Sequence, residues 1–314
     1  MTAMSAPRSA RCRAYPRPRP RAPPVISAVL PESFLLMGHL RSVVWGCGDF
    51  VLHCRRETKT RHKMDEFRTP EKSKRPYGNR ARIGLIVPSP NTVAETEFWR
   101  MAPEGVTIHT TRMLLRTDQT KDPLKDMEQY LPRVLDELRG LEVDVVAYGC
   151  TASALKTPHE QTRNEIADEL DRPAVTTMGS VLAAFEAFDV KSVAVGSPYT
   201  DDINEAERRY FESQGLTVTA DKGLMLFEAQ KFGRHMNLVP LEAVEELAES
   251  IDTPAAEAVF LSCSDMATLG ALDRLEDKLS KPVISSAQAT FWGALRAAGV
   301  DDRIEGCGRL LREH

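Results

Sequence analysis

The sequence predicts an α/β protein with two pseudo-symmetric domains. Each domain is a short parallel sheet flanked by helices, and the active site is expected in the cleft between them. The first observation is a set of apolar runs, such as VDVVAYGCT at 143–151 and AEAVFLSCS at 256–264. These runs lack the polar alternation of half-exposed strands and are typical of buried parallel strands. The second observation is that both halves of the chain carry the same landmarks.

Three landmarks recur at a nearly constant spacing. VPSPNT at 87–92 matches VGSPYT at 195–200, which lies 108 positions later. The two cysteine runs place Cys150 and Cys263 113 positions apart. RPAVTT at 172–177 matches KPVISS at 281–286, with an offset of 109. Such regularity indicates a duplicated set of βα units.

Strand and helix signals alternate along the chain. Each expected strand is a short apolar run, and each expected helix is a longer amphipathic or apolar segment between two such runs. The expected strands lie at residues 82–87, 106–113, 143–150, 174–177, 192–197, 216–220, 256–264 and 282–285. The expected helices lie at residues 94–101, 122–138, 157–170, 179–188, 200–211, 241–250, 266–279 and 287–298.

Local signals set several helix ends. Asn91 or Thr92 can cap the helix at 94–101, because short polar side chains accept hydrogen bonds from unpaired backbone N–H groups. Asp122, followed by a proline, is a cap for the next helix, and Pro132 is expected to kink that helix or divide it in two. TPHE at 157–160 has the pattern of a capping box with proline at the first helical position.

Residues 1–80 differ in composition from the rest of the chain. They carry a formal charge of +11, against −15 for the remainder, and contain the tract RCRAYPRPRPRAPP, which cannot pack a core. We expect translation to begin at Met64; a disordered basic arm and a basic targeting segment are the alternatives. The expected domains are 1–80, a disordered or mis-assigned extension; 81–189 plus 287–314, the first α/β domain; and 190–286, the second.

Composition argues against several classes of partner. No apolar run approaches the roughly 18 residues of a membrane span, and the acidic body argues against nucleic acid. The six cysteines are scattered without a CxxC pair, so we expect free thiols, no metal and a cytoplasmic location. No glycine-rich phosphate loop follows a strand, so no cofactor is expected.

The two cysteines Cys150 and Cys263 are the candidate catalytic residues. A single buried cysteine is more often a small apolar filler, but these two stand at equivalent strand ends, where open α/β sheets carry their chemistry. Each is followed by a hydroxyl residue, Thr151 or Ser264, and a helix N-terminus there would lower a thiol pKa and favour a carboxylate. Such a pair can move a proton between two faces of a small acid or add to an activated double bond.

Asn91 and Tyr199 occupy matching positions after the first strand of each half. They can be plain turn residues, which explains Asn91 in part and Tyr199 poorly, because tyrosine is not a capping residue. Both can also donate a hydrogen bond to a carboxylate. We therefore include them among the candidate substrate-binding residues.

Several of these segments together resemble the maleate cis–trans isomerase family. That family belongs to the aspartate/glutamate racemase superfamily and has the arylmalonate decarboxylases as close relatives. The resemblance covers about residues 82–300. It rests on PSPNT, AYGCTAS around Cys150, SPYTDDIN around Tyr199, SCSD around Cys263, and KPVISSAQATFWGALRAAGV.

The resemblance implies a cofactor-free, metal-free isomerase of a small dicarboxylic acid, of the maleate-to-fumarate type. Cys150 would add to the double bond and Cys263 would donate and accept the proton. The carboxylates would be held by Asn91, Thr151, Tyr199 and Ser264. It also implies that the last long helix packs back on the first domain.

Two departures from the family pattern stand out. Ala229 is near the position where the family often has a carboxylate-binding asparagine, and Asp265 adds a negative charge after the second cysteine. The alternatives to a maleate-type isomerase are an Asp/Glu-type racemase, an arylmalonate-decarboxylase-like enzyme, and a non-catalytic small-acid-binding protein. We also expect a homo-oligomer, a dimer or a tetramer.

Overall fold

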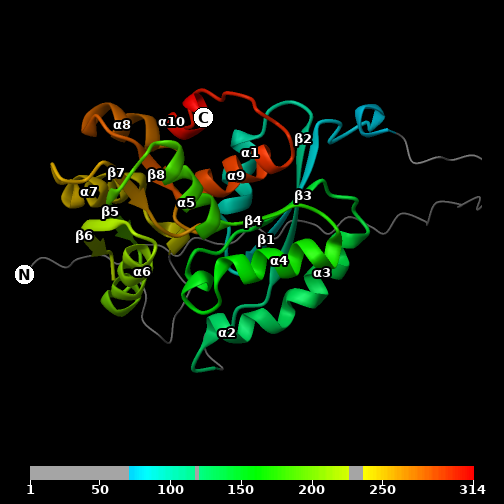
Figure 1. The fold of residues 1–314 in the computed structure, drawn as a ribbon, viewed down its shortest axis with the longest axis horizontal. Helices are drawn as coiled ribbons and strands as arrows, with labels where there is room; N and C mark the ends of the chain where they lie inside the picture. The colour runs from blue at the N-terminus through cyan, green and yellow to red at the C-terminus, as the bar shows by residue number, and fades with distance from the viewer. Residues whose placement is uncertain (1–70, 117–119, 226–235) are drawn as a thin grey trace, which may run out of the picture. The chain divides into compact units, whose positions relative to one another are not determined.

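The computed structural model describes residues 71–116, 120–225 and 236–314 (Figure 1). They belong to one compact unit, Phe67–His314. The expectations for the N-terminal extension fall mainly on residues 1–70, and the departure at Ala229 falls within 226–235; both lie outside the described residues.

The described chain forms two parallel sheets of four strands each, which confirms the predicted fold class. The strand order is β2-β1-β3-β4 in the first sheet and β6-β5-β7-β8 in the second, so the second sheet repeats the topology of the first. The strands of the first sheet are β1 Ala81–Pro88, β2 Val106–Met113, β3 Val145–Tyr148 and β4 Ala174–Thr176. Those of the second are β5 Ser192–Ser197, β6 Thr217–Gly223, β7 Ala258–Leu261 and β8 Val283–Ser285.

Helices connect the strands of each sheet. They are α1 Ala94–Met101, α2 Pro123–Met127, α3 Leu131–Arg139, α4 His159–Leu170, α5 Thr177–Ala187, α6 Asp201–Ser213, α7 Leu241–Ile251, α8 Leu272–Leu279, α9 Ser286–Ala297 and α10 Arg309–Glu313. Short 3₁₀ turns lie at Lys72–Lys74, Glu128–Tyr130, Ala152–Leu155 and Met236–Leu238. None of the helices in the described part of the chain is long and apolar enough to cross a membrane.

The predicted signals at two helix starts have different outcomes. The N-cap residue of α1 is Val93 and not Asn91 or Thr92, but Asn91 still accepts the backbone N–H groups of Val93 at 3.1 Å and Ala94 at 3.0 Å through Oδ1. Asp122 caps α2 by accepting the N–H of Lys125. The helix expected at 122–138 is divided in two by a 3₁₀ turn, with Pro132 in the first turn of α3.

Two other predicted helix starts are wrong. The expected capping box at 157–160 does not form, because Pro158 is the N-cap residue of α4 and the Thr157 hydroxyl donates to Glu128 instead. The helix expected from residue 266 begins only at Leu272. The preceding residues are in turns, where the N–H groups of Thr268 and Leu269 donate to Glu97 of α1.

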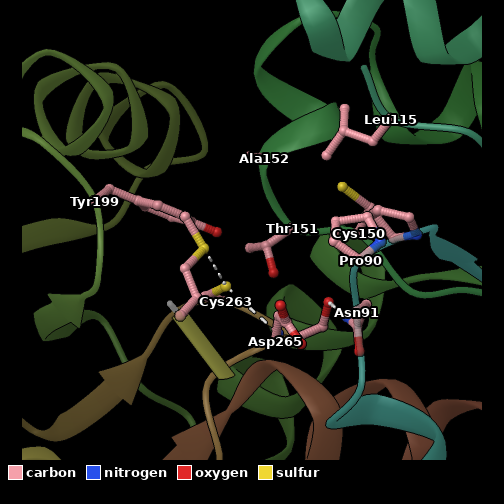
Figure 2. Close-up of a pocket in the computed structure, with 12 residues that line it drawn as sticks. Pro90, Asn91, Leu115, Cys150, Thr151, Ala152, Tyr199, Cys263 and Asp265 are labelled. Atoms are coloured by element: carbon pink, nitrogen blue, oxygen red, sulfur yellow. Dashed lines mark hydrogen bonds between the residues drawn. The ribbon is translucent and has the colours of Figure 1, made fainter. Parts of the chain in front are cut away.

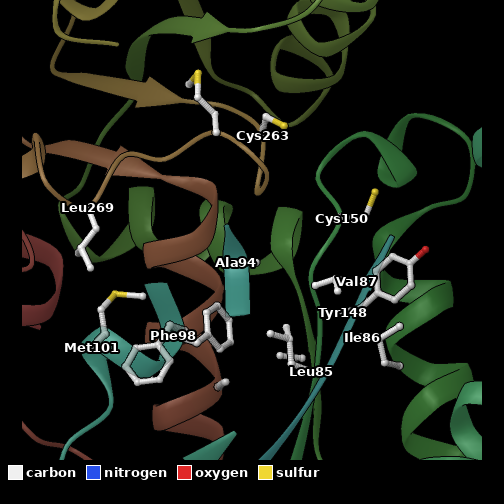
Figure 3. Close-up of a cluster of buried hydrophobic side chains, with 14 of the residues drawn as sticks. Leu85, Ile86, Val87, Ala94, Phe98, Met101, Tyr148, Cys150, Cys263 and Leu269 are labelled. Atoms are coloured by element: carbon white, nitrogen blue, oxygen red, sulfur yellow. The ribbon is translucent and has the colours of Figure 1, made fainter. Parts of the chain in front are cut away.

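The helix after the last strand of each half packs against the core of the other half. In α5, Phe185 contacts Phe260 of β7 edge-to-face at 5.9 Å between ring centroids. In α9, Phe291 meets Phe98 of α1 at 5.1 Å, and α9 also contacts β3 and β4. Figure 3 shows Phe98 in this cluster, with Cys150 and Cys263 near its upper edge. The two halves therefore share their cores through these exchanged helices.

Candidate active site

A cavity of about 40 Å³ lies where loops from both sheets meet. All six residues predicted from the sequence line it, so the structure brings every one of them to the same place. The lining residues are Pro88, Pro90, Asn91, Leu115, Cys150, Thr151, Ala152, Tyr199, Met236, Cys263, Ser264 and Asp265. In Figure 2, Cys150 and Cys263 stand on opposite sides, with Thr151 between them.

The loop after β3 positions Cys150. Gly149 passes so close to β1 that a Cβ atom there would lie 3.2 Å from the Ile86 carbonyl oxygen and 3.1 Å from the Val87 side chain, so a larger residue would force these neighbours to shift by a few tenths of an ångström. The N–H of Gly149 donates to the same Ile86 carbonyl at 2.7 Å, which anchors the loop. Cys150 is buried at the start of the 3₁₀ turn that follows.

Burial raises the pKa of the Cys150 thiol. Hydrogen bonds from the Ser153 hydroxyl and from the backbone N–H groups of Ser153 and Ala152 act in the opposite direction, because they favour the thiolate. Ser153 is itself held by the Tyr148 hydroxyl, which donates to it at 3.1 Å. The thiol is thus desolvated but surrounded by hydrogen-bond donors.

Cys263 has a backbone conformation that non-glycine residues seldom adopt, with φ of +92°. Such strain persists only where neighbouring contacts hold it. On the N-terminal side, Ser262 donates its N–H to the Gly196 carbonyl at 2.8 Å and its hydroxyl to Glu207 at 2.6 Å. The N–H of Cys263 itself donates to Ser286 at 3.0 Å. The second cysteine is therefore aimed into the cavity by a strained and well-anchored turn.

The pKa of the Cys263 thiol is also raised, first by burial and then by the negative charge of Asp265. The Asp265 N–H and a hydrogen bond from Tyr199 oppose this rise. The sequence-based expectation that helix N-termini lower both thiol pKa values is wrong. Cys150 is followed by a four-residue 3₁₀ turn and Cys263 by turns that extend to Leu272, so neither thiol sits at an α-helix N-terminus.

Asn91 and Ser264 are linked across the two halves. The amide nitrogen of Asn91 donates to Ser264 Oγ at 3.1 Å, and Ser264 Oγ donates to the Gly149 carbonyl at 2.9 Å. The single hydroxyl proton of Ser264 is thus directed at Gly149. The amide of Asn91 has a second N–H beyond the one given to Ser264, and Asn91 lines the cavity.

Tyr199 and Thr151 are the other two candidate donors. Burial raises the pKa of Tyr199 well above its ordinary value, so it remains a neutral phenol with a proton to donate. Its backbone is held by a hydrogen bond from its N–H to Ser197 Oγ at 3.0 Å. Thr151 is buried, and its hydroxyl contacts Ser286 at 2.9 Å.

Sequence reasoning missed four kinds of lining residue. Leu115 follows β2, whose carboxyl end lies at the same sheet edge as that of β1, and the parallel topology was the signal that could have found it. Met236 contacts Cys263, with 3.5 Å between their sulfur atoms, and nothing in its local sequence indicates this. The motifs identified in the sequence also contain Pro88, Pro90 and Ala152, but these residues were not expected to line the cavity.

Asp265 lines the cavity as well, although its carboxylate is engaged with the backbone. It accepts the N–H of Thr92 at 2.8 Å, and the pKa of this carboxyl is raised to about 6 by burial, against hydrogen bonds from Thr92 and Val93. Among the described residues that form the lining there is no lysine or arginine. An anion here would be held by neutral hydrogen-bond donors.

Comparisons with known proteins identify relatives of this chain. The family model for arylmalonate decarboxylase matches residues 83–311. A maleate isomerase from Geobacillus stearothermophilus is 29% identical over 247 residues, which cover 73% of this chain and 96% of that protein.

Two solved structures share the fold. The maleate isomerase from Pseudomonas putida S16 with maleate is 27% identical, with a TM-score of 0.68 over 74% of this chain and 97% of that one. A cysteine-to-serine mutant of the Nocardia farcinica maleate cis-trans isomerase, with a covalently bound succinylcysteine intermediate, is 26% identical. Its TM-score is 0.69 over 74% of this chain and 99% of that chain. Because the matched segment of the family model runs from β1 to α10 and includes both cysteine loops, this chain belongs to the arylmalonate decarboxylase family.

Proposed function

We propose that this protein is a cofactor-independent cis–trans isomerase of a small dicarboxylic acid, of the maleate-to-fumarate type. The observation that carries the proposal is the placement of Cys150 and Cys263 on opposite sides of one cavity (Figure 2). Two thiols facing each other across a small acid can supply a nucleophile on one side and a proton on the other.

In the proposed reaction, the Cys150 thiolate forms a C–S bond to one alkene carbon, and the π electron pair moves to the neighbouring carbon and its carboxylate. Cys263 gives its proton to that carbon, which leaves a succinyl thioether on Cys150. The former double bond is now single and rotates. Return of a proton to Cys263 and breakage of the C–S bond restore the double bond in the trans form and regenerate the Cys150 thiolate.

The two thiols have different surroundings, which supports this division of roles. The charge of Asp265 adds to burial at Cys263 and holds its proton more firmly. At Cys150 the groups that act besides burial are hydrogen-bond donors, which favour the thiolate. Cys150 is therefore the better nucleophile and Cys263 the better acid.

Neutral donors would hold the carboxylates of the substrate. Thr151 and Tyr199 each have a hydroxyl at the cavity, and these hydroxyls would have to turn from Ser286 and Cys263 towards the substrate; Asn91 has a second amide N–H beyond the one given to Ser264. Because the Ser264 proton is directed at Gly149, we assign Ser264 the role of orienting Asn91 in addition to contact with the substrate. Charge on the substrate would thus be balanced by several hydrogen bonds and not by an ion pair.

The test is turnover of maleate by the purified protein, followed by ¹H NMR for the appearance of fumarate. Cys150→Ser and Cys263→Ser are each expected to abolish turnover. Cys307→Ser is the matched control, because Cys307 is also a buried free thiol but does not line the cavity. In Cys263→Ser, water has to supply the proton to the carbon, and the thiolate base that would remove it again is absent. We therefore expect slow accumulation of a succinyl adduct on Cys150 with the mass of one maleic acid, detected by peptide mass spectrometry.

The alternatives are tested in the same preparation. Absence of fumarate formation together with carbon dioxide release from phenylmalonate would favour a decarboxylase, and racemisation of aspartate or glutamate would favour a racemase. A binding protein would retain affinity for maleate in both cysteine variants without turning it over. Any of these results in place of isomerisation would overturn the proposal.

We also propose a cytoplasmic location, a homo-oligomeric state (a dimer or a tetramer) and the division into domains at 81–189 plus 287–314 and 190–286. Light scattering on the purified protein measures the oligomeric state, and cell fractionation the location. Limited proteolysis tests the boundary near residue 189, where cleavage is expected because Asp189 is exposed; the boundary at 286 is buried and is not expected to be cut.

A further inference from the structure

One oxygen atom connects the two cysteine loops. Ser286 is the first residue of α9, is fully buried, and lies outside the lining of the cavity. Its Oγ accepts the backbone N–H of Cys263 at 3.0 Å and contacts Thr151 Oγ1 at 2.9 Å. Thr151 directly follows the first cysteine, so this single hydroxyl touches the loops of both halves.

The hydrogen bond from the Cys263 N–H to Ser286 helps to hold a strained backbone conformation. The φ of +92° at Cys263 requires anchors on either side, and the bond to Ser286 is the anchor on the Cys263 peptide itself. Without it, a buried N–H group would be left unpaired, which native structures rarely tolerate. Ser286 therefore helps to fix the direction in which the Cys263 sulfur points.

The equivalent position in the first half makes different contacts. The position equivalent to Ser286 is Thr177, the first residue of α5. The Thr177 hydroxyl donates to the Tyr148 carbonyl at 3.1 Å and accepts from the Thr290 hydroxyl of α9 at 2.9 Å. Both hydroxyls therefore connect the two halves, but of the two it is Ser286 that contacts both cysteine loops.

The contact with Thr151 can change direction when a substrate binds. In the structure, the Thr151 hydroxyl donates to Ser286 Oγ. Both groups are rotors with one proton and two lone pairs, so Ser286 can instead donate to Thr151. The Thr151 proton is then available to a carboxylate in the cavity, and Ser286 keeps a lone pair for the Cys263 N–H.

We propose that Ser286 is a positioning residue of the proposed isomerase: it holds the Cys263 turn and, by reversing its hydrogen bond to Thr151, makes Thr151 a donor to the substrate carboxylate. The proposal rests on the proposed function for its substrate. It predicts two separable effects of losing the Ser286 hydroxyl. KM rises because Thr151 is misdirected, and kcat falls because Cys263 moves.

The first experiment compares Ser286→Ala with two other variants. Ser286→Ala is expected to lower kcat/KM for maleate by on the order of 10- to 100-fold, the effect of a small misplacement of a catalytic group. Ser286→Thr keeps the hydroxyl, as in Thr177, and is expected to restore most of the loss. Ser180→Ala removes another buried hydroxyl, in α5, which has no hydrogen-bond partner among the described residues and does not line the cavity, and it is expected to stay close to wild type.

A double-mutant cycle tests the link to Thr151. Thr151→Val removes the donor itself and is expected to raise KM. If Ser286 acts on KM through Thr151, then Ser286→Ala added to Thr151→Val raises KM less than it does in the wild-type background. Fully additive effects on KM would refute the hydrogen-bond reversal.

A third measurement does not depend on turnover. Alkylation of Cys263 by iodoacetamide, followed by peptide mass spectrometry, is expected to be several-fold faster in Ser286→Ala than in wild type or Ser180→Ala. If wild type does not isomerise maleate but this difference appears, the proposed function fails and the positioning of Cys263 stands. If Ser286→Ala and Ser180→Ala behave alike in alkylation, kcat/KM and Tm, Ser286 is only a stabilising residue and the inference is wrong.

Discussion

Asp265 holds Cys263 and the start of α1 at the same time. Its backbone N–H lies 3.4 Å from Cys263 Sγ, and its carboxylate accepts the N–H of Thr92 at 2.8 Å. The N–H favours the Cys263 thiolate, whereas the carboxylate charge raises the thiol pKa, and of these two effects the charge is the larger. Asp265 therefore joins the two halves and keeps the second thiol protonated.

Removing this charge is expected to make Cys263 more acidic. Asp265→Asn keeps an oxygen for the Thr92 N–H but loses the negative charge, so the pKa of Cys263 should fall. A fall of roughly 0.3 to 1 pKa unit makes alkylation of Cys263 about two- to tenfold faster at a pH below the thiol pKa. Peptide-resolved iodoacetamide labelling at pH 8 measures the rate. Asp277→Asn, at an exposed position of α8, is the control and should leave it unchanged.

The rate of isomerisation is expected to rise with pH. Burial raises the pKa of Cys150, so at neutral pH only a small fraction is thiolate. Below the pKa, that fraction rises about tenfold for each pH unit, and kcat/KM for maleate should follow it from pH 7 to 8. Cys263 remains protonated in this range because its pKa is raised as well. A kcat/KM that is constant between pH 7 and 9 would show that Cys150 is already ionised at neutral pH.

Glu207 is expected to make the fold less stable as pH rises. Burial raises its pKa from 4.5 to about 7 in the folded protein. Between these values the unfolded chain releases the proton and the folded chain keeps it, so the free energy of unfolding falls with pH. The shift corresponds to a loss of about 3 kcal/mol, complete above pH 7.

The variant Glu207→Gln tests this directly, because glutamine resembles the protonated acid and keeps an oxygen for the Ser262 hydroxyl. Relative to wild type, its free energy of unfolding should improve by about 2–3 kcal/mol between pH 5 and pH 8. Urea unfolding at the two pH values gives the difference. Equal pH dependence in the two proteins would contradict the raised pKa.

The contact between Phe98 and Phe291 is expected to stabilise the pairing of the two halves. Both side chains are fully buried, so Phe98→Ala or Phe291→Ala should lower the free energy of unfolding by about 3–5 kcal/mol. The neighbouring Trp99 is 48% exposed on the same helix, and Trp99→Ala should change it by only about 0.5 kcal/mol. Urea unfolding of the three variants measures the values. A similar loss for Trp99→Ala would indicate that the effect comes from α1 and not from the contact.

Much of the fold could be predicted because its signals are local. Continuous apolar runs identified the strands, and the bounds of β2 and α1 agree with the prediction to the residue. Asp122 was identifiable as a cap, and Asn91 as an acceptor of N–H groups at the start of α1, because these bonds join residues within three positions. The expected start of α8 failed because Glu97, from the other half, takes the N–H groups of Thr268 and Leu269.

The residues of the candidate site could largely be predicted from the sequence, but the pKa shifts of its two thiols could not. Parallel strands carry their functional loops at one edge of the sheet. The matched positions of the two halves therefore identified four of the candidate residues, Asn91, Cys150, Tyr199 and Cys263. Met236 was missed because its contact with Cys263 joins positions 27 residues apart without a motif. The thiol pKa shifts were predicted with the wrong sign because they depend on desolvation, which a sequence does not display.

By itself, the sequence determined the duplicated α/β plan, the two thiols and the residues around them, because periodicity and spacing are properties of the chain alone. Only the tertiary structure decided that α5 and α9 exchange between the halves, that Ser286 touches both cysteine loops, and that Asp265 separates the acidities of the two thiols. These relations join residues that no local sequence pattern connects, or they depend on burial. Closeness in space and burial both arise only when the two halves have packed together.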